Sequence, residues 1–118
     1  MLDRLSKLLI ESQIRYVSER DLQDAIERLL ISESIPYERE YNVAPHGRID
    51  FYFPAERIGL EVKIKDSATK LIRQLLEYAQ DDRIGALLLV TTKSRLATMP
   101  PMMNGKPVRN VFLWVSGF

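Results

Sequence analysis

The sequence contains no cysteine, and His46 is its single histidine. Disulfides are therefore excluded, as are zinc sites built on Cys and His, so a bound metal would have to be held by oxygen. No apolar run approaches the roughly 20 residues that a membrane helix needs. The amino terminus carries an early acid, Asp3, which is unlike a signal peptide. We expect a cytoplasmic protein with no membrane partner.

The sequence has no strong excess of one charge. It contains 17 Lys and Arg and 16 Asp and Glu, which give a formal charge of +1. Overall charge therefore does not indicate a polyanionic partner. The local distribution is more informative, because a basic set follows a stretch rich in acids between residues 11 and 40. That set consists of Arg48, Lys63, Lys65, Lys70 and Arg73. It predicts positive potential focused at one cleft.

A chain of 118 residues fits one domain, 1–118, with a core of about 18–115. Apolar periodicity and turn residues predict three helices and five strands. The expected helices cover 2–9, 19–32 and 67–80, and the expected strands cover 37–43, 48–53, 58–64, 85–91 and 109–115. The first helix packs on the core or meets a partner, and 92–106 is expected to be a loop. The order predicts an α/β fold, in which an antiparallel meander leads into a parallel strand, helix, strand crossover.

Three polar residues interrupt the apolar strands of this expected meander. Asp50 lies in the strand 48–53, and Glu61 and Lys63 share one face of the next strand. A hairpin would bring Asp50 beside Glu61. Two carboxylates offer hard oxygen ligands to Mg²⁺, and a lysine beside them can orient or deprotonate a water for attack on phosphate. The alternatives are an edge-strand acid at Asp50 and a surface ion pair between Glu61 and Lys63.

The series Glu27, Asp50 in Arg-Ile-Asp-Phe, and Glu61-Val-Lys63 before a helix resembles the PD-(D/E)XK nuclease superfamily, over about 18–91. Ile49 stands where the family name has proline. The resemblance implies a restriction-endonuclease-like domain, with Asp50 and Glu61 as Mg²⁺ ligands and Mn²⁺ as a possible substitute. It also implies the Val62 backbone carbonyl as a further ligand and Lys63 as the residue that positions the hydrolytic water. Glu27 would be the helix-borne acid, acting directly or through a water, and its alternative is a solvated helix residue.

Two shorter patterns refine this resemblance. Gln74-Leu-Leu-Glu-Tyr78 is similar to the Q-x-x-x-Y motif of RecB-like members, which implies a catalytic role for Gln74. Glu27-Arg28 is similar to a pair on the first helix of archaeal Holliday-junction resolvases. The alternative for Gln74 and Tyr78 is an exposed polar helix face. The residues expected to contact DNA are Arg28, Arg48, Lys65, Lys70, Arg73 and Tyr78.

The sequence thus predicts a Mg²⁺-dependent DNA endonuclease of a bacterial, archaeal or phage-infected cell. Its small size favours a structure-specific enzyme like a Holliday-junction resolvase, acting as a homodimer because two symmetric strands must be cut. The alternative enzyme is a RecB-like exonuclease or nickase. An alternative of another class is a nucleic-acid-binding module without catalysis.

Overall fold

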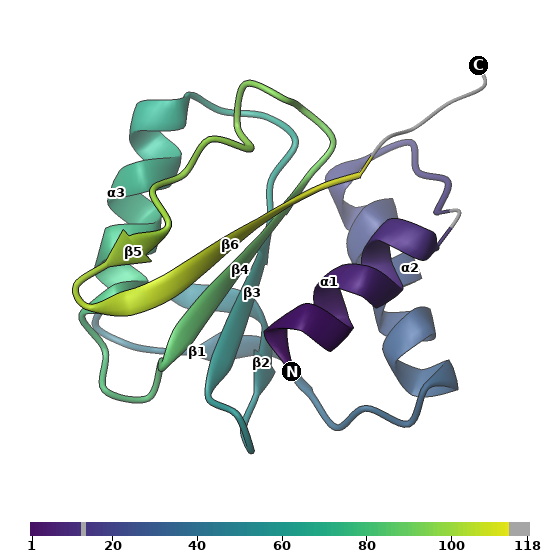
Figure 1. The fold of residues 1–118 in the computed structure, drawn as a ribbon, viewed down its shortest axis with the longest axis horizontal. Helices are drawn as coiled ribbons and strands as arrows, with labels where there is room; N and C mark the ends of the chain where they lie inside the picture. The colour runs from purple at the N-terminus through teal and green to yellow at the C-terminus, as the bar shows by residue number, and fades with distance from the viewer. Residues whose placement is uncertain (13, 114–118) are drawn as a thin grey trace.

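A computed structural model describes residues 1–12 and 14–113 of the chain (Figure 1). Three helices and six strands follow one another along the chain: α1 (Leu2–Glu11), α2 (Glu19–Ser32), β1 (Glu38–Asn42), β2 (Arg48–Phe53), β3 (Ile58–Val62), α3 (Ala68–Ala79), β4 (Ala86–Thr91), β5 (Met102–Met103) and β6 (Lys106–Phe112). No helix within the described residues is long and apolar enough to cross a membrane.

All six strands form one mixed sheet in the order β1-β2-β3-β4-β6-β5. The first three strands pair antiparallel, and β4 then pairs parallel with both β3 and β6. Helix α3 is the crossover between β3 and β4. The α/β fold with an antiparallel meander and a parallel crossover is therefore confirmed.

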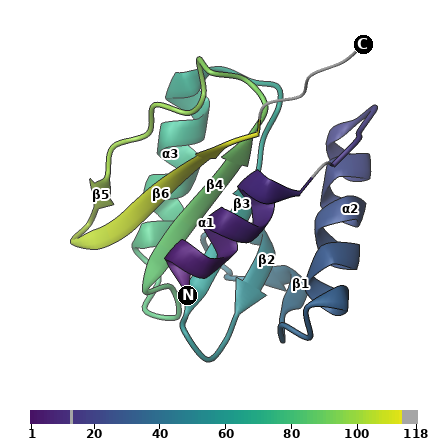
Figure 2. The same cartoon turned by 45° about the vertical axis from the view of Figure 1, so that its right-hand side comes forward.

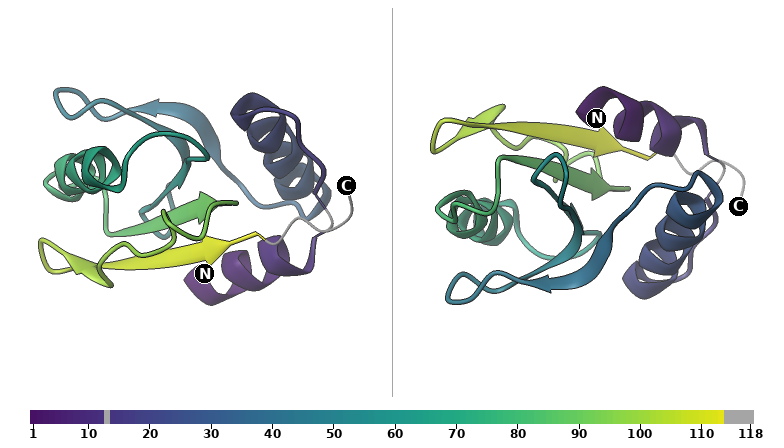
Figure 3. Two further views of the ribbon diagram at one scale, coloured as in Figure 1. Left: turned by 90° about the horizontal axis from the view of Figure 1, so that it is seen from above. Right: turned by 90° about the horizontal axis from the view of Figure 1, so that it is seen from below.

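The sheet separates two helical layers, with α1 and α2 on one face and α3 on the other (Figures 2 and 3). Each layer has its own apolar core, represented by Leu5, Leu22 and Phe51 on the first face and by Leu71 and Leu75 on the second. Every residue of β4 is buried, as expected for a central strand covered on both faces.

Helices α2 and α3 each begin at a serine cap. Ser18 Oγ accepts a hydrogen bond from the Asp21 amide at 3.1 Å, and Ser67 Oγ accepts one from the Lys70 amide at the same distance. Because Ser18 caps α2, the first residue of that helix is Glu19. This start places the Glu19 side chain beside the end of β3.

The carboxyl-terminal part of the sheet departs from the prediction. The expected loop 92–106 contains β5, and β6 begins at Lys106 instead of Arg109. The turn between them is Asn104-Gly105, whose positive φ angles of 51° and 73° fit a two-residue hairpin. This hairpin signal lay inside the segment interpreted as a loop. Residues 114 and 115 of the expected last strand lie outside the described residues, and β3 ends at Val62, two residues early.

Candidate functional site

Asp50 and Glu61 lie against each other where β2 and β3 separate. The backbone N–H of Asp50 donates to Glu61 Oε1 at 3.2 Å, and the backbone N–H of Val62 donates to Asp50 Oδ2 at 2.7 Å. Each strand therefore supplies an amide to the carboxylate of the other strand. The predicted convergence of the two acids is present in the structure.

The location of this pair follows from the strand register. The paired residues of β2 and β3 run from Phe53 with Ile58 to Phe51 with Leu60 and end there. The next β3 amide that faces β2, that of Val62, bonds to the Asp50 carboxylate instead of to a backbone carbonyl. Asp50 thus terminates the ladder and opens the sheet at the site.

Burial and like charge both disfavour ionisation of the two acids. Glu61 is only 3 % exposed, and its burial raises its pKa well above the usual value, with further raising by Asp50. Burial also raises the pKa of Asp50, although the Val62 amide opposes the shift. Lys63 Nζ lies 4.0 Å from Glu61 Oε2 and lowers the pKa of both acids. The pair therefore favours a nearby cation.

Tyr78 supports Glu61 from within the core. Its hydroxyl donates to the Arg48 carbonyl at 2.8 Å and lies 3.4 Å from Glu61 Oε2. Gln74 Nε2 donates to the same hydroxyl at 2.9 Å. This chain of contacts links Gln74 on α3 to the buried carboxylate on β3.

The prediction that Tyr78 contacts DNA is wrong, because the residue is 1 % exposed. Tyr78 lies three and seven positions after Leu75 and Leu71, so it shares their buried helix face. Leu76, by contrast, is 40 % exposed. The apolar face of α3 is thus rotated toward Tyr78.

The acid that α2 directs to the site is Glu19. Glu19 Oε1 accepts the backbone N–H of Ile64 at 2.9 Å, and the Glu19 charge helps to raise the pKa of Asp50. Glu27, the predicted acid, is two turns further along the helix. Its carboxylate instead accepts from the Tyr37 hydroxyl at 2.9 Å and from Arg39 Nη1 at 3.0 Å. The structure therefore does not join Glu27 to the Asp50 and Glu61 cluster.

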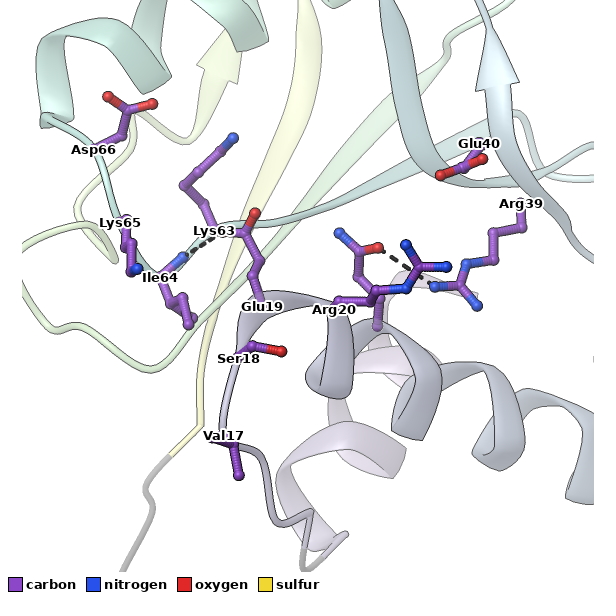
Figure 4. Close-up of a pocket in the computed structure, with 11 residues that line it drawn as sticks. Val17, Ser18, Glu19, Arg20, Arg39, Glu40, Lys63, Ile64, Lys65 and Asp66 are labelled. Atoms are coloured by element: carbon purple, nitrogen blue, oxygen red, sulfur yellow. Dashed lines mark hydrogen bonds between the residues drawn. The ribbon is translucent and has the colours of Figure 1, made fainter.

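A cavity of about 490 Å³ opens beside Lys63, between the start of α2 and the end of β3 (Figure 4). Glu19, Lys65 and Asp66 line it together with Arg20 and Glu40. The view shows side chains from the start of α2, from the segment after β3 and from β1 around the same space. Acidic and basic side chains thus surround an open space next to Lys63, which lies beside the Asp50 and Glu61 pair. We call these three residues the candidate centre.

The expected DNA contacts are distributed over several surfaces. Arg48, Lys65, Lys70 and Arg73 are exposed, and Lys70 Nζ lies 3.5 Å from Asp66 Oδ1. Arg28 lines a separate crevice of about 420 Å³ between α2 and the residues Ser12, Ile14 and Arg15. Of these four, Lys65 lines the cavity beside Lys63, whereas Arg28 faces another part of the surface.

Sequence reasoning missed Glu19 for a definable reason. The expected helix began at residue 19, but periodicity alone does not tell which acid of a helix reaches a sheet. The usable signal was that Glu19 is the first helical residue, where its side chain can reach the amide of a strand end.

The site offers fewer acidic side chains as metal ligands than a centre built from three or more of them. Within 1–12 and 14–113, no group of three or more His, Cys, Asp or Glu side chains is arranged to hold a metal ion. The candidate ligands are Asp50 and Glu61, with the Val62 backbone carbonyl implied by the family resemblance. Comparisons with protein-family models, with curated proteins and with solved structures found no match.

Proposed function

We propose that this protein is a Mg²⁺-dependent phosphodiester hydrolase acting on DNA, in the manner of the PD-(D/E)XK nucleases that its sequence resembles. The observation that carries the proposal is the meeting of Asp50 and Glu61 at the open end of the β2 and β3 ladder, with the Lys63 amine 4.0 Å from Glu61 Oε2. A purely structural ion pair does not account for the second carboxylate, because it adds repulsion to a buried site.

The donor set fits Mg²⁺. Both acids have a raised pKa, and a divalent cation would favour their ionised forms. Mg²⁺ is commonly held by one or two carboxylates, with waters and substrate phosphate completing its coordination, so a third acid is not required. Asp50 and Glu61 would hold the ion. When bound, it would stabilise the charge that develops on the phosphate oxygens.

The remaining groups have distinct roles in the proposed reaction. Lys63 is the only amine in contact with the carboxylate pair among the described residues, and it would orient the attacking water or take part of its proton. Gln74 and Tyr78 act as positioning residues, because their hydrogen bonds fix the Glu61 side chain. Glu19 replaces Glu27 as the helix-borne acid of the proposal.

Within nucleases, a structure-specific endonuclease similar to the Holliday-junction resolvases remains the preferred proposal, with a homodimer and a cytoplasmic location. It rests on the sequence resemblance. The contact between Gln74 and Tyr78 is compatible with the RecB-like alternative as well. Substrate preference separates the two possibilities.

The test is a cleavage assay on labelled four-way junction, flap, nicked, single-stranded and duplex DNA, in Mg²⁺ or EDTA. We expect Mg²⁺-dependent cleavage, with Mn²⁺ as a working substitute. Absence of cleavage of every substrate in both metals, while DNA is still bound, would favour the non-catalytic binding module.

Lys63→Gln tests the assignment within the protein. We expect a loss of about 10²-fold to 10⁴-fold in kcat with DNA binding retained, as for the loss of a positioned proton-transfer group. Lys93→Gln is the matched control, because Lys93 is an exposed lysine outside the site. Equal effects of the two substitutions would contradict the role of Lys63.

A further inference from the structure

Asp50 lies in the part of β2 that has no backbone partner in β3. The ladder between these two strands covers only residues 51–53 of β2. The residues before Asp50 pair instead with β1, which is an edge strand of the sheet. The position of Asp50 therefore depends on β1 and on the hairpin turn, residues 43–47, that joins β1 to β2.

Arg83 fastens this hairpin turn to the segment that follows α3. Its Nη2 donates to the Ala44 carbonyl at 2.9 Å, and its Nη1 donates to the Asn42 carbonyl at 3.4 Å. The same guanidinium donates to Asp81, from Nε to Oδ1 at 2.8 Å and from Nη2 to Oδ2 at 2.7 Å. One side chain thus joins the end of β1 and the hairpin turn to Asp81. We call this set of contacts the Arg83 bridge.

The Arg83 bridge is charged and fixed in orientation. Asp81 is 7 % exposed, and hydrogen bonds from Arg83 lower its pKa to about 2. A carboxylate that accepts two bonds from one guanidinium fixes the plane of that group as well as its position. A second tie from the turn to α3, His46 Nδ1 to Glu77 Oε2 at 2.9 Å, lies at the exposed surface and is weakened by water. The Arg83 bridge is thus the stronger of these two ties.

Movement of the hairpin turn would reach both acids of the candidate centre. Arg48, the residue after the turn, accepts a hydrogen bond from the Tyr78 hydroxyl at its carbonyl, at 2.8 Å. Gly47 lies against the Tyr78 ring, because a Cβ there would be 3.5 Å from Tyr78 Cε1. The same hydroxyl lies 3.4 Å from Glu61 Oε2. The turn is therefore connected to Asp50 along β2 and to Glu61 through Tyr78.

We propose that Arg83 is a positioning residue of the candidate centre: its guanidinium, held by Asp81, fixes the hairpin turn and thereby the placement of the Asp50 carboxylate relative to Glu61. The effect on catalysis rests on the proposed function, whereas the placement of Asp50 can be measured without it. A shift of about 1 Å in a catalytic group can lower a rate about 10²-fold. An arginine that does not touch the acids thus controls their geometry.

The test removes the guanidinium without leaving a buried carboxylate unpaired. Arg83→Ala is combined with Asp81→Asn, and Asp81→Asn alone is the reference. Hydrogen exchange of the Val62 amide reports the placement of Asp50, because this amide donates to Asp50 Oδ2. We expect Val62 to exchange about tenfold faster in the double variant than in the reference, as for a weakened hydrogen bond to a charged group.

Arg57→Ala is the matched control. Arg57 Nη2 also donates to a carbonyl of the segment after α3, that of Asp82, but Arg57 belongs to the turn at the opposite end of β2. Exchange of the Leu88 amide, in the central strand β4, reports loss of overall stability. Arg57→Ala should leave the ratio of Val62 to Leu88 exchange rates unchanged. Equal ratios in the control and the double variant would overturn the inference, whether or not the protein cuts DNA.

Kinetics add a second readout. In an active enzyme the double variant should lower kcat about tenfold to 10²-fold relative to Asp81→Asn, with KM and DNA binding unchanged. An unchanged kcat would overturn the inference and keep the proposed function. Absence of cleavage by the wild type in both Mg²⁺ and Mn²⁺ would overturn the proposed function, and the exchange ratio would still decide the inference.

A measurement on the wild type covers a double variant that does not fold. The Val43 amide closes the hairpin turn by donating to the Gly47 carbonyl at 2.9 Å. If the turn positions Asp50, the amides of Val43 and Val62 should exchange through one common opening as denaturant is raised below the unfolding transition. Separate openings of the two amides would overturn the inference.

Discussion

Replacement of Glu61 by glutamine should make the metal-free protein more stable while abolishing cleavage. Glu61 is 3 % exposed, and both its burial and the neighbouring Asp50 raise its pKa. A glutamine of nearly equal size keeps an oxygen that can accept the Asp50 amide, and it carries no charge to desolvate. The substitution thus removes the main cause of electrostatic strain from the site.

The magnitude follows from the contacts. Two unit charges 4 Å apart interact by about 4 kcal/mol at an effective dielectric constant of about 20. The attraction between Lys63 and Glu61 at 4.0 Å therefore largely offsets the repulsion from Asp50, and the desolvation cost remains. Replacing a buried ion pair by neutral side chains of similar volume is often neutral or stabilising by about 1–4 kcal/mol, and here Lys63 keeps Asp50, whose pKa it also lowers, as its carboxylate partner. We expect about 1–2 kcal/mol here, or a rise in Tm of about 4–8 °C for a chain of this size.

The pH dependence has a defined sign. Because the pKa of Glu61 is raised in the folded protein, the folded state binds this proton more tightly than the unfolded chain does. The stability from this group is fully present below the usual glutamate pKa and is lost as pH rises through the raised folded pKa. Wild-type stability in EDTA should therefore fall over this range, and Glu61→Gln should flatten the fall.

The assay is thermal unfolding in EDTA over a pH series, repeated in Mg²⁺. Mg²⁺ at about 100 times its Kd should stabilise the wild type by about 2.7 kcal/mol, and the variant much less. Glu56→Gln, at an exposed turn residue, is the control and should leave the pH profile unchanged. A lower Tm for Glu61→Gln in EDTA, or an unaltered pH dependence, would refute the reasoning.

Three further substitutions test the surroundings of the site. Tyr78→Phe should cost about 1–3 kcal/mol, because a buried hydroxyl with several partners is lost, and should also lower kcat. Tyr52→Phe, which removes a hydroxyl that donates to the Arg83 carbonyl, should cost stability with kcat unchanged, and equal kcat values for the two variants would rule out a positioning role for Tyr78. Gly59→Ala should destabilise the fold by about 1–3 kcal/mol or more in chemical denaturation, because a Cβ there would lie 2.3 Å from Ile49 Cδ1. A neutral effect would show that Ile49 can move aside.

The sequence predicted the strands of the meander and the meeting of Asp50, Glu61 and Lys63, because alternation along a strand fixes which side chains share a face. It did not predict that Asp50 would replace a backbone partner of Val62, since this depends on where two strands separate. Family resemblance indicated Glu27 as the acid on the second helix, but the crossing of α2 over the sheet places Glu19, and not Glu27, beside the end of β3.

The errors on α3 and near the carboxyl terminus have similar physical origins. A spacing of four residues from Gln74 to Tyr78 suggested a shared exposed face, yet the tyrosine also follows Leu71 at a spacing of seven residues. The aromatic ring of Tyr78 has more apolar surface to bury than the Gln74 side chain, and its burial determined the rotation of the helix. The short strand β5 was missed because two residues give no periodicity, although the Asn104-Gly105 turn beside it was visible.

The bond from the Val62 amide to the Asp50 carboxylate has a practical consequence for how the proposed reaction is tested. Alanine at position 50 would delete an acceptor that the backbone needs, so lost turnover could reflect a distorted sheet instead of missing chemistry. Asparagine retains an oxygen for that amide. An inert protein for trapping bound DNA is therefore better made by the amide substitution, which leaves the scaffold intact.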